Sequence, residues 1–250
     1  MEEVPVTMPD LGGRRVLVTG AAQRLGAVIA RAFAECGAAV VVHCFRSRSD
    51  AESLAASLPA CPGPLRHEAI SCDLADPDAV RRMAEAVGPV DCLVNNAAMW
   101  IRGGAPQAEL DRQEAVNHLA PCELIRLFAA MRPQERNFSA VNILDAATLS
   151  DFTPASQYEA SKATLRRNTL ELALELAPHV RVNAVAPGPV FPPRELGAAG
   201  MKRTPGMLPL KRPVDPADVA RAVVFLASAQ SVTGAILPVD CGQTLLSQQP

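Results

Sequence analysis

The chain has 250 residues, of which 49% are hydrophobic, so it can bury a large core and is not a disordered protein. Its net charge of −2 leaves no basic excess, which argues against nucleic acid as a partner. The acidic N-terminus lacks the apolar core of a signal peptide, and no apolar run is long enough for a membrane span. The seven cysteines are scattered without metal-ligand spacing. We therefore expect a cytoplasmic protein with reduced thiols, no metal site and no membrane partner.

Strand and helix patterns alternate along the chain after a tail over residues 1–13. Apolar runs predict strands near 14–19, 38–43, 66–71, 90–95, 138–144, 180–186 and 235–240. Helical spacing predicts helices near 24–37, 49–58, 76–87, 109–131 and 215–228, and the helix that carries Tyr158 and Lys162 is expected to run to about residue 177.

Nearly continuous apolar strands, each followed by a helix, indicate an α/β fold with a doubly wound parallel sheet and helices on both faces. Because no linker or change in composition interrupts the pattern, we expect one domain over residues 14–250. The exception to compactness is the segment 187–213, which is rich in proline and glycine and is predicted to be a loop over a site.

The sequence "TGAAQRLG" at 19–26 lies between the first strand and the first helix, where a dinucleotide-binding turn is expected. Gly20 permits a tight turn, and Gly26 lets the helix approach the strand and the pyrophosphate. The helix N-terminus would then offer N–H groups to the phosphates. This motif is looser than GxGxxG, so two glycines that merely form a turn remain an alternative.

The end of the second predicted strand favours NADP(H) over NAD. NAD enzymes usually carry an acidic residue there, but "VVHCFRSRSD" offers Arg46 and Ser47 and no carboxylate before Asp50. A guanidinium and a hydroxyl suit a 2′-phosphate, and Arg24 from the first turn can reach the same place. An ordinary solvated basic loop is the alternative interpretation.

Tyr158, the only tyrosine, precedes Lys162, one of three lysines, by four residues. On a helix the two side chains would share a face. An ammonium beside a phenol makes its proton easier to remove, which suits acid–base chemistry near neutral pH. A surface pair that meets by chance is the alternative.

Together these motifs resemble those of the short-chain dehydrogenase/reductases over about residues 14–243. The matching elements, in the family's order, are TG-x5-G at 19–26, Asp73-Leu74, "NNAA" at 95–98, Asn117, Tyr158-x3-Lys162 and "PGPV" at 187–190. The resemblance implies a single Rossmann-like domain with a sheet of about seven parallel strands. It also implies an oxidoreductase that forms a homodimer or homotetramer and acts on a small molecule.

The resemblance further implies a role for each matching residue. Tyr158 would donate the proton, Lys162 would hold the nicotinamide ribose and lower the tyrosine pKa, and Asn117 would support a relay water through a break in its helix. The residues expected to contact NADP(H) are Gly20, Gln23, Arg24, Leu25, Gly26, Arg46, Ser47, Asp73, Leu74, Asn96, Ala97, Ala98, Tyr158, Lys162, Pro187, Gly188 and Val190.

One position departs from the family pattern. The family usually has a serine about a dozen residues before the tyrosine, and here the residue thirteen before Tyr158 is Asp145. This aspartate, with TG-x3-Arg-x-Gly in the first turn, is similar to the pteridine and dihydromonapterin reductases. Those enzymes use NADPH to reduce a C=N bond of a pterin, which they hold against an aromatic side chain. Trp100 follows "NNAA" at that place, so Trp100, Asp145 and Tyr158 are the expected substrate residues.

Two other functions remain open. A short-chain reductase of a ketone, sugar or 3-oxoacyl carbonyl would not need Asp145 or Trp100, which could then be a structural cap and a core or dimer-contact residue. A non-catalytic dinucleotide-binding protein would share the first turn, but it would be expected to lose the tyrosine–lysine pair. The four histidines, His43, His67, His118 and His179, are dispersed and are expected to have no special role.

Overall fold

The computed structural model describes residues 9–101, 104–149, 156–192 and 204–246. Its strands are β1 (Arg15–Val18), β2 (Ala39–Cys44), β3 (Glu68–Ser71), β4 (Cys92–Asn95), β5 (Phe138–Ile143), β6 (Val180–Pro187) and β7 (Ile236–Val239). They form one parallel sheet in the order β3-β2-β1-β4-β5-β6-β7. The predicted doubly wound, seven-stranded fold is therefore confirmed.

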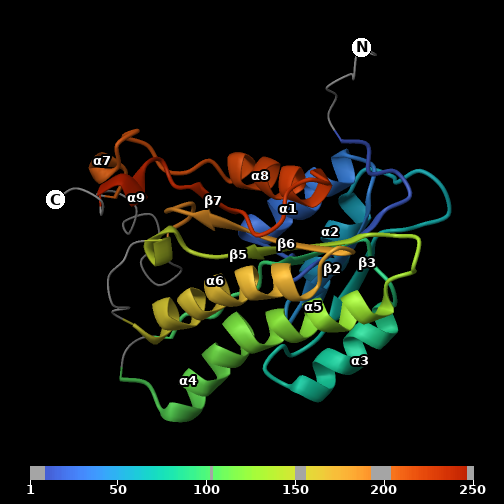
Figure 1. The fold of residues 1–250 in the computed structure, drawn as a ribbon, viewed down its shortest axis with the longest axis horizontal. Coiled ribbons are helices and arrows are strands. Elements are labelled where there is room, and N and C mark those ends of the chain that lie inside the picture. The colour runs from blue at the N-terminus through green and yellow to red at the C-terminus, as the bar shows by residue number, and fades with distance from the viewer. Residues whose placement is uncertain (1–8, 102–103, 150–155, 193–203, 247–250) are drawn as a thin grey trace.

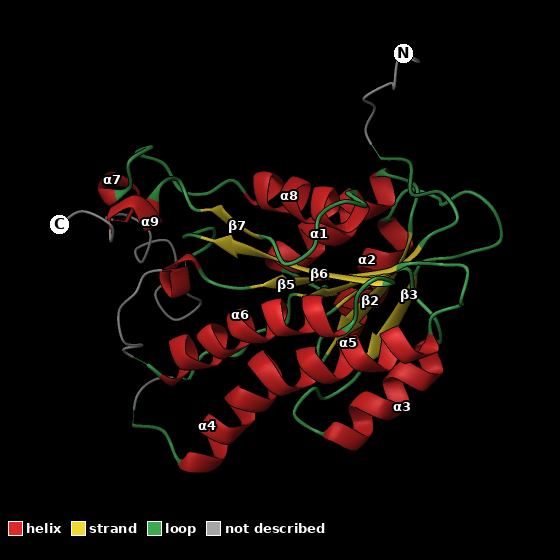
Figure 2. Cartoon of the chain, in the orientation of Figure 1, coloured by secondary structure: helices red, strands yellow, loops and turns green. Residues whose placement is uncertain are grey.

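Helices cover both faces of this sheet (Figures 1 and 2). One face carries α1 (Arg24–Glu35), α2 (Arg48–Ser57) and α8 (Pro216–Ser228), and the other carries α3 (Pro77–Val87), α4 (Gln107–Glu114), α5 (Ala120–Met131) and α6 (Gln157–Glu175). The chain also forms two one-turn helices that the sequence pattern did not predict, α7 (Thr204–Met207) and α9 (Gln243–Leu246). The single helix predicted near 109–131 is divided, because a π-helical turn at Ala115–Leu119 separates α4 from α5.

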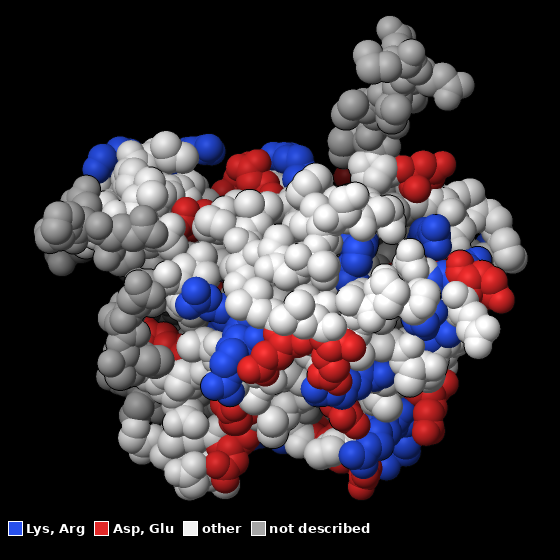
Figure 3. Space-filling view, in the orientation of Figure 1, with Lys and Arg blue, Asp and Glu red and all other residues white. Residues whose placement is uncertain are grey.

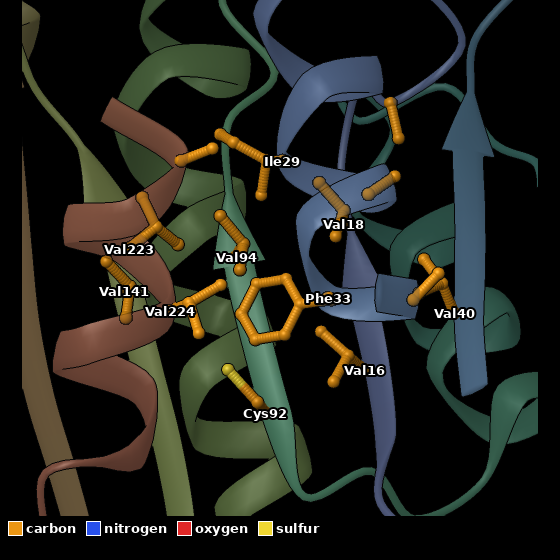
Figure 4. Packing of buried hydrophobic residues seen from close by; sticks show 14 of the residues in the cluster. Val16, Val18, Ile29, Phe33, Val40, Cys92, Val94, Val141, Val223 and Val224 are labelled. Carbon is orange, nitrogen blue, oxygen red and sulfur yellow. The ribbon is translucent and has the colours of Figure 1, made fainter. Parts of the chain in front are cut away.

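Two apolar layers hold the helices on the sheet. Phe33 of α1 is fully buried and lies among Val16, Cys92, Val94 and Val224, so it joins β1 and β4 to α8 (Figure 4). Burial of such a side chain stabilises the fold by about 1.5–3 kcal/mol. The second layer packs α3, α5 and α6 against the opposite face. These layers make the carboxyl ends of the central strands a rigid platform.

The predicted helix starts at Asp76 and Asp215 are confirmed. Asp76 accepts hydrogen bonds from the N–H groups of Asp78 and Ala79, and Asp215 accepts one from Ala217. Each aspartate thereby satisfies N–H groups that a helix leaves without an internal partner.

The two irregular segments of the prediction are only partly described. Within the tail, Leu11 N–H donates to the carbonyl oxygen of Cys36 at 2.8 Å, so residues 9–13 contact the domain. Within the predicted loop 187–213, α7 occupies four residues, and the N–H of Val214 donates to Pro189 at 3.1 Å. Residues 1–8 and 193–203 lie outside the described part of the chain.

The strand β7 forms one edge of the sheet. The carbonyl oxygens of Ala235 and Val239 accept hydrogen bonds from the N–H groups of Ala184 and Gly188, so these two residues face β6. Because neighbouring residues of a strand point in opposite directions, Ile236 and Pro238 turn their backbone groups away from the sheet.

The surface drawn in Figure 3 carries acidic and basic side chains side by side over the lower helices, rather than one broad basic patch. Among the described residues, no helix has both the length and the apolar character that a membrane span requires. The seven cysteines are free thiols.

Candidate active site

Apart from Asn117, Tyr158 and Lys162, which lie on helices, the predicted site residues lie at the carboxyl ends of six neighbouring strands. Gly20 follows β1, Asp73 follows β3, Asn96 follows β4, Asp145 follows β5 and Gly188 follows β6, while Arg46 follows β2. The strand order reverses its direction between β1 and β4, which is where open parallel sheets bind ligands. The topology therefore brings residues that are far apart in sequence together at the carboxyl ends of the strands.

The first turn has no room for side chains at its two glycines. Gly20 has a φ of +60°, and a Cβ added there would lie 2.9 Å from the Cα of Ala97. A Cβ at Gly26 would collide with the carbonyl oxygen of Gly20 and would lie 2.6 Å from the Asn96 amide nitrogen. The helix N-terminus at α1 can thus come close to a bound phosphate, as the sequence motif predicts.

The segment after β4 is hydrogen-bonded to this turn. Thr19 Oγ1 accepts hydrogen bonds from the N–H groups of Asn96 and Ala97, both at 3.0 Å. The Asn96 side chain donates to the carbonyl oxygens of Thr19 at 2.8 Å and Gly20 at 3.1 Å. Asn96 and Ala97 therefore shape the turn directly.

His43, which no sequence motif singled out, joins the turn to the end of β3. The N–H of Gly20 donates to His43 Nδ1 at 3.1 Å, and His43 Nε2 lies 3.1 Å from the carbonyl oxygen of Cys72. Since Nδ1 accepts, Nε2 must carry the proton and donate to Cys72. Burial lowers the pKa of His43 to about 4, so the ring stays neutral in this bridge.

We expect the free energy of unfolding to fall as the pH decreases from about 6.5 to 4. In that range the unfolded chain protonates His43 and the folded chain does not, so stability is lost as acid is added. The lowered pKa corresponds to about 3 kcal/mol at pH 4. Urea denaturation across this range should therefore show a smaller loss in His43→Gln than in the native chain. Identical pH dependence in the two proteins would contradict the role given to His43.

Two arginines lie over one exposed phenylalanine at the end of β2. The guanidinium carbons of Arg46 and Arg112 are 4.7 Å and 5.1 Å from the centre of the Phe45 ring. Ser47 precedes α2 at its N-cap position. This places a basic group and a hydroxyl where the sequence predicts a 2′-phosphate site.

Asp73 is paired with Arg112, a residue of α4 that the sequence analysis missed. The guanidinium of Arg112 donates to both carboxylate oxygens, at 2.8 Å and 2.7 Å. Burial would raise the pKa of Asp73, but hydrogen bonds from Arg112 and Ala75, with the charges of Arg112 and Arg46, bring it below its usual value. The Asp73 carboxylate, which the resemblance assigns to the NADP(H) site, is thus ionised and paired within the protein.

Arg24 is directed toward the loop after β6 and not toward the end of β2. Its guanidinium donates to the carbonyl oxygen of Pro192 at 2.9 Å and lies 5.1 Å from the Phe191 ring centre. Its φ is +53°, which is unusual for a residue with a side chain. The neighbouring Gln23 side chain donates to Asp50. These contacts hold Arg24 at the start of the loop after β6, and its role at the 2′-phosphate stays a prediction.

Tyr158 and Asp145 are in contact across the site. The Tyr158 hydroxyl donates to Asp145 Oδ2 at 3.4 Å, which is long for such a bond. The other carboxylate oxygen accepts from the N–H of Ala147 at 2.9 Å and so caps the 3₁₀ turn at Ala146–Leu149. The cap considered as an alternative role for Asp145 is present, and the same carboxylate also faces the tyrosine.

The charges around Tyr158 favour its protonated form. Burial, then the charge and hydrogen bond of Asp145, raise its pKa above the usual value. This differs from the expected lowering by Lys162. Lys162 is buried, and its ammonium donates to the carbonyl oxygen of Ile143 at 2.7 Å. Burial lowers the pKa of Lys162 to about 8, against the opposing charge of Asp145.

Asn117 lies in the middle of the π-helical turn, so the expected break in its helix is present. Its side chain accepts from the N–H of Met99 at 2.7 Å and donates to the carbonyl oxygen of the same residue at 2.8 Å. It also donates to Ser161 Oγ at 3.1 Å, and Ser161 donates to the Tyr158 carbonyl oxygen. Asn117 thereby joins the segment after β4 to the helix that carries Tyr158.

Trp100 is 54% exposed, which excludes a place in the core. Ala98, two residues earlier, is also exposed. Both follow β4, so they lie at the carboxyl ends of the strands, as do most of the other predicted site residues.

The remaining predicted residues are mainly structural in their contacts. Leu25 packs against the core on the α1 side, and Leu74 is buried on the opposite face. Pro187 ends β6 and is buried, and Val190 packs against the first layer. A Cβ at Gly188 would lie 2.9 Å from the Cα of Asp240, so glycine lets these two backbones approach.

Comparison with known proteins gives matches along nearly the whole chain. A family model described as enoyl-(acyl carrier protein) reductase matches residues 20–244. An L-xylulose reductase of Bos taurus is 35% identical over 245 residues, covering 93% of this chain and 97% of its own length. The crystal structure of FolM alternative dihydrofolate reductase 1 from Brucella canis with NADP has a TM-score of 0.84 and 31% identity, covering 96% and 98%. The angucycline C-6 ketoreductase LanV with bound NADP has a TM-score of 0.82 and 26% identity, covering 95% and 98%.

Proposed function

The chain belongs to the short-chain dehydrogenase/reductase family, and on this premise we propose that it is an NADPH-dependent reductase of a C=N bond in a pterin. Asp145 carries this proposal, because it places a carboxylate against Tyr158 where the family pattern has a serine. The likeness to a protein called an alternative dihydrofolate reductase supports it, since dihydrofolate contains a pterin ring.

The residues of the first turn and of the β2 end fit NADP(H). The absence of room for a Cβ at Gly20 and Gly26 lets backbone N–H groups and the start of α1 approach a pyrophosphate. Arg46 and Ser47 offer a cation and a hydroxyl to a 2′-phosphate. When bound, NADPH supplies the hydride for the reduction.

Tyr158 and its neighbours would control the proton. A C=N bond becomes CH–NH when hydride adds to carbon and a proton adds to nitrogen. The raised pKa of Tyr158 keeps its hydroxyl protonated, and the strongly basic nitrogen formed by hydride addition would take that proton. Lys162 would then stabilise the resulting phenolate, and its pKa of about 8 leaves it largely charged at neutral pH. Asp145 would bind the polar edge of the substrate or return a proton to Tyr158.

Trp100 would cover the substrate ring. Its exposed indole is a flat surface at the carboxyl ends of the strands, where the site lies. Stacking on an aromatic ligand contributes about 0.5–1.5 kcal/mol beyond burial. A pterin is flat and aromatic, so this contact favours it over an aliphatic ketone or sugar.

The proposed activity is tested by following NADPH oxidation with 7,8-dihydrobiopterin and dihydromonapterin, beside L-xylulose and a panel of ketones. Turnover of a dihydropterin with higher efficiency than any carbonyl compound is the expected result. The second candidate function is carbonyl reduction, which the 35% identity to an L-xylulose reductase favours. Turnover of carbonyl substrates alone would establish that candidate in place of the first.

We expect a preference for NADPH over NADH that depends on Arg46. Arg46→Asp should weaken NADPH binding by a few kcal/mol, because a charge-assisted contact becomes a repulsion. Arg66→Asp, which makes the same change of charge at an exposed position before β3, should leave the affinity near its native value. Titration of each variant with both nucleotides measures this. Equal efficiency of NADH and NADPH in the native enzyme would contradict the prediction.

We also propose a homodimer or homotetramer located in the cytoplasm. Leu170 and Leu174 on α6, Leu119 before α5 and Phe225 on α8 are exposed, and large exposed apolar side chains are common at subunit contacts. The seven free thiols favour a reducing compartment.

A further inference from the structure

The backbone on each side of Trp100 is held by a buried amide side chain. Asn117 makes two hydrogen bonds to the backbone of Met99, and Gln113 Oε1 accepts from the N–H of Ile101 at 2.6 Å. Gln113 and Asn117 are four residues apart, one in α4 and one in the π-helical turn, and both are fully buried. The side chains of Asn117 and Gln113 therefore hold the backbone of the residues immediately before and immediately after Trp100.

Gln113 makes this contact at a cost to stability. Its Nε2 atom is buried and has no hydrogen-bond partner within the described part of the chain. A buried donor without a partner is unfavourable, and an apolar side chain of similar size would avoid that cost. The one side-chain hydrogen bond that Gln113 makes with a described residue, Ile101, is the benefit that an apolar residue could not provide.

We propose that Gln113 is a positioning residue that fixes Trp100 for stacking against a flat heterocyclic substrate. This inference rests on the proposed function to the extent that it places the substrate against Trp100. With Met99 and Ile101 both held, the indole cannot drift with its backbone, so less conformational freedom is lost when a ring stacks on it. Asn117 supplies one point of attachment, and Gln113 supplies the second.

Trp100 is the only tryptophan, so tryptophan fluorescence reports on this position alone. Gln113→Leu should make the anisotropy of Trp100 decay faster and increase its quenching by acrylamide in the protein without added ligands. Gln113→Glu keeps an oxygen that can accept from Ile101, so this variant should keep the native anisotropy decay and acrylamide quenching of Trp100. Gln107→Leu makes the same change at an exposed position of α4 and should have no effect.

Steady-state kinetics then test the consequence for the substrate. Gln113→Leu should raise the KM for 7,8-dihydrobiopterin about tenfold, the effect of losing one hydrogen bond, while kcat and NADPH affinity change less than about twofold. A general loss of folding would instead lower NADPH affinity and kcat together. If the native enzyme reduces only carbonyl compounds, the flat heterocyclic substrate of the proposal is wrong, and the anisotropy and quenching of Trp100 alone then test whether Gln113 positions it.

Unchanged Trp100 anisotropy in Gln113→Leu would overturn the proposal, whatever the substrate is. A mobile Trp100 with an unchanged KM in Gln113→Leu would also overturn it, because the hydrogen bond to Ile101 would then have no role in substrate binding. Amide hydrogen exchange in the native protein provides a test that needs no variant. The Ile101 amide should be protected, and exchange at the rate of an unprotected loop amide would rule out the hydrogen bond to Gln113.

Discussion

Tyr158→Phe is expected to reduce kcat at least 10²-fold while NADPH affinity stays within about twofold of native. The change removes the hydroxyl that would give the proton and retains the ring. Among the described residues, the hydroxyl makes one long hydrogen bond, to Asp145, so its loss should have little effect on packing. Single-turnover measurements of NADPH oxidation, with nucleotide binding measured separately, provide the comparison. A variant that keeps more than about a tenth of the native rate would exclude Tyr158 as the proton donor.

Lys162→Ala provides the contrast to that variant. Lys162 is buried beneath the site and donates to the carbonyl oxygen of Ile143. If its ammonium also holds the nicotinamide ribose, its removal should weaken NADPH binding as well as turnover. A Lys162→Ala variant that loses turnover alone would limit the lysine to the proton step.

Asp145→Ser is expected to lower kcat/KM for a dihydropterin by about 10²-fold and to permit weak reduction of simple ketones. A hydrogen bond from a charged group contributes about 1.5–3 kcal/mol, and serine cannot replace it. Asp145→Asn separates the two roles of the carboxylate, because an amide oxygen can still accept from Ala147 and cap the 3₁₀ turn. We therefore expect the Asp145→Asn variant to keep the native melting temperature and to lose the same pterin activity.

Trp100→Ala should raise the KM for the pterin with little effect on NADPH affinity, because the indole would touch only the outer face of the substrate. If the native enzyme ignores every pterin and reduces ketones, and if neither the Asp145 nor the Trp100 variants change that activity, then carbonyl reduction is the function.

The fold could be predicted because its signals are local. The inner strands of the parallel sheet are buried on both faces and therefore read as mostly apolar runs, as β2 does. Asp76 and Asp215 mark helix starts through side-chain caps that reach only two or three residues along the chain. Because the strands are parallel, the motifs that follow them were certain to gather at one edge of the sheet.

Contacts that depend on the rotation of a helix about its axis could not be predicted in the same way. Arg112 meets Asp73 across 39 residues, and whether it points there depends on how α4 is turned against the sheet. Gln113 contacts Ile101 just before a π-helical turn, which adds a residue to the helical repeat and changes the direction of everything after it. The sequence shows no signal for that turn apart from the resemblance at Asn117.

His43 was missed for a different reason. A histidine in an apolar strand is usually a core residue, and nothing nearby in sequence suggests that its ring reaches the glycine turn after β1. Only the pairing of β1 with β2 places the Nδ1 atom beside the N–H of Gly20. The hydrogen bond from Arg24 to the carbonyl oxygen of Pro192 joins residues far apart in sequence, so no local pattern could predict it.

The outward turn of Pro238 on β7 bears on how the protein behaves at high concentration. The edge of a sheet can recruit a strand from another molecule, and this is a common first step toward aggregates. On β7 the backbone groups of Ile236 and Pro238 face outward, and proline has no N–H that could donate to a strand of another molecule. An incoming strand would find half of the donors that it needs along this edge, so the sheet resists growing beyond seven strands on that side.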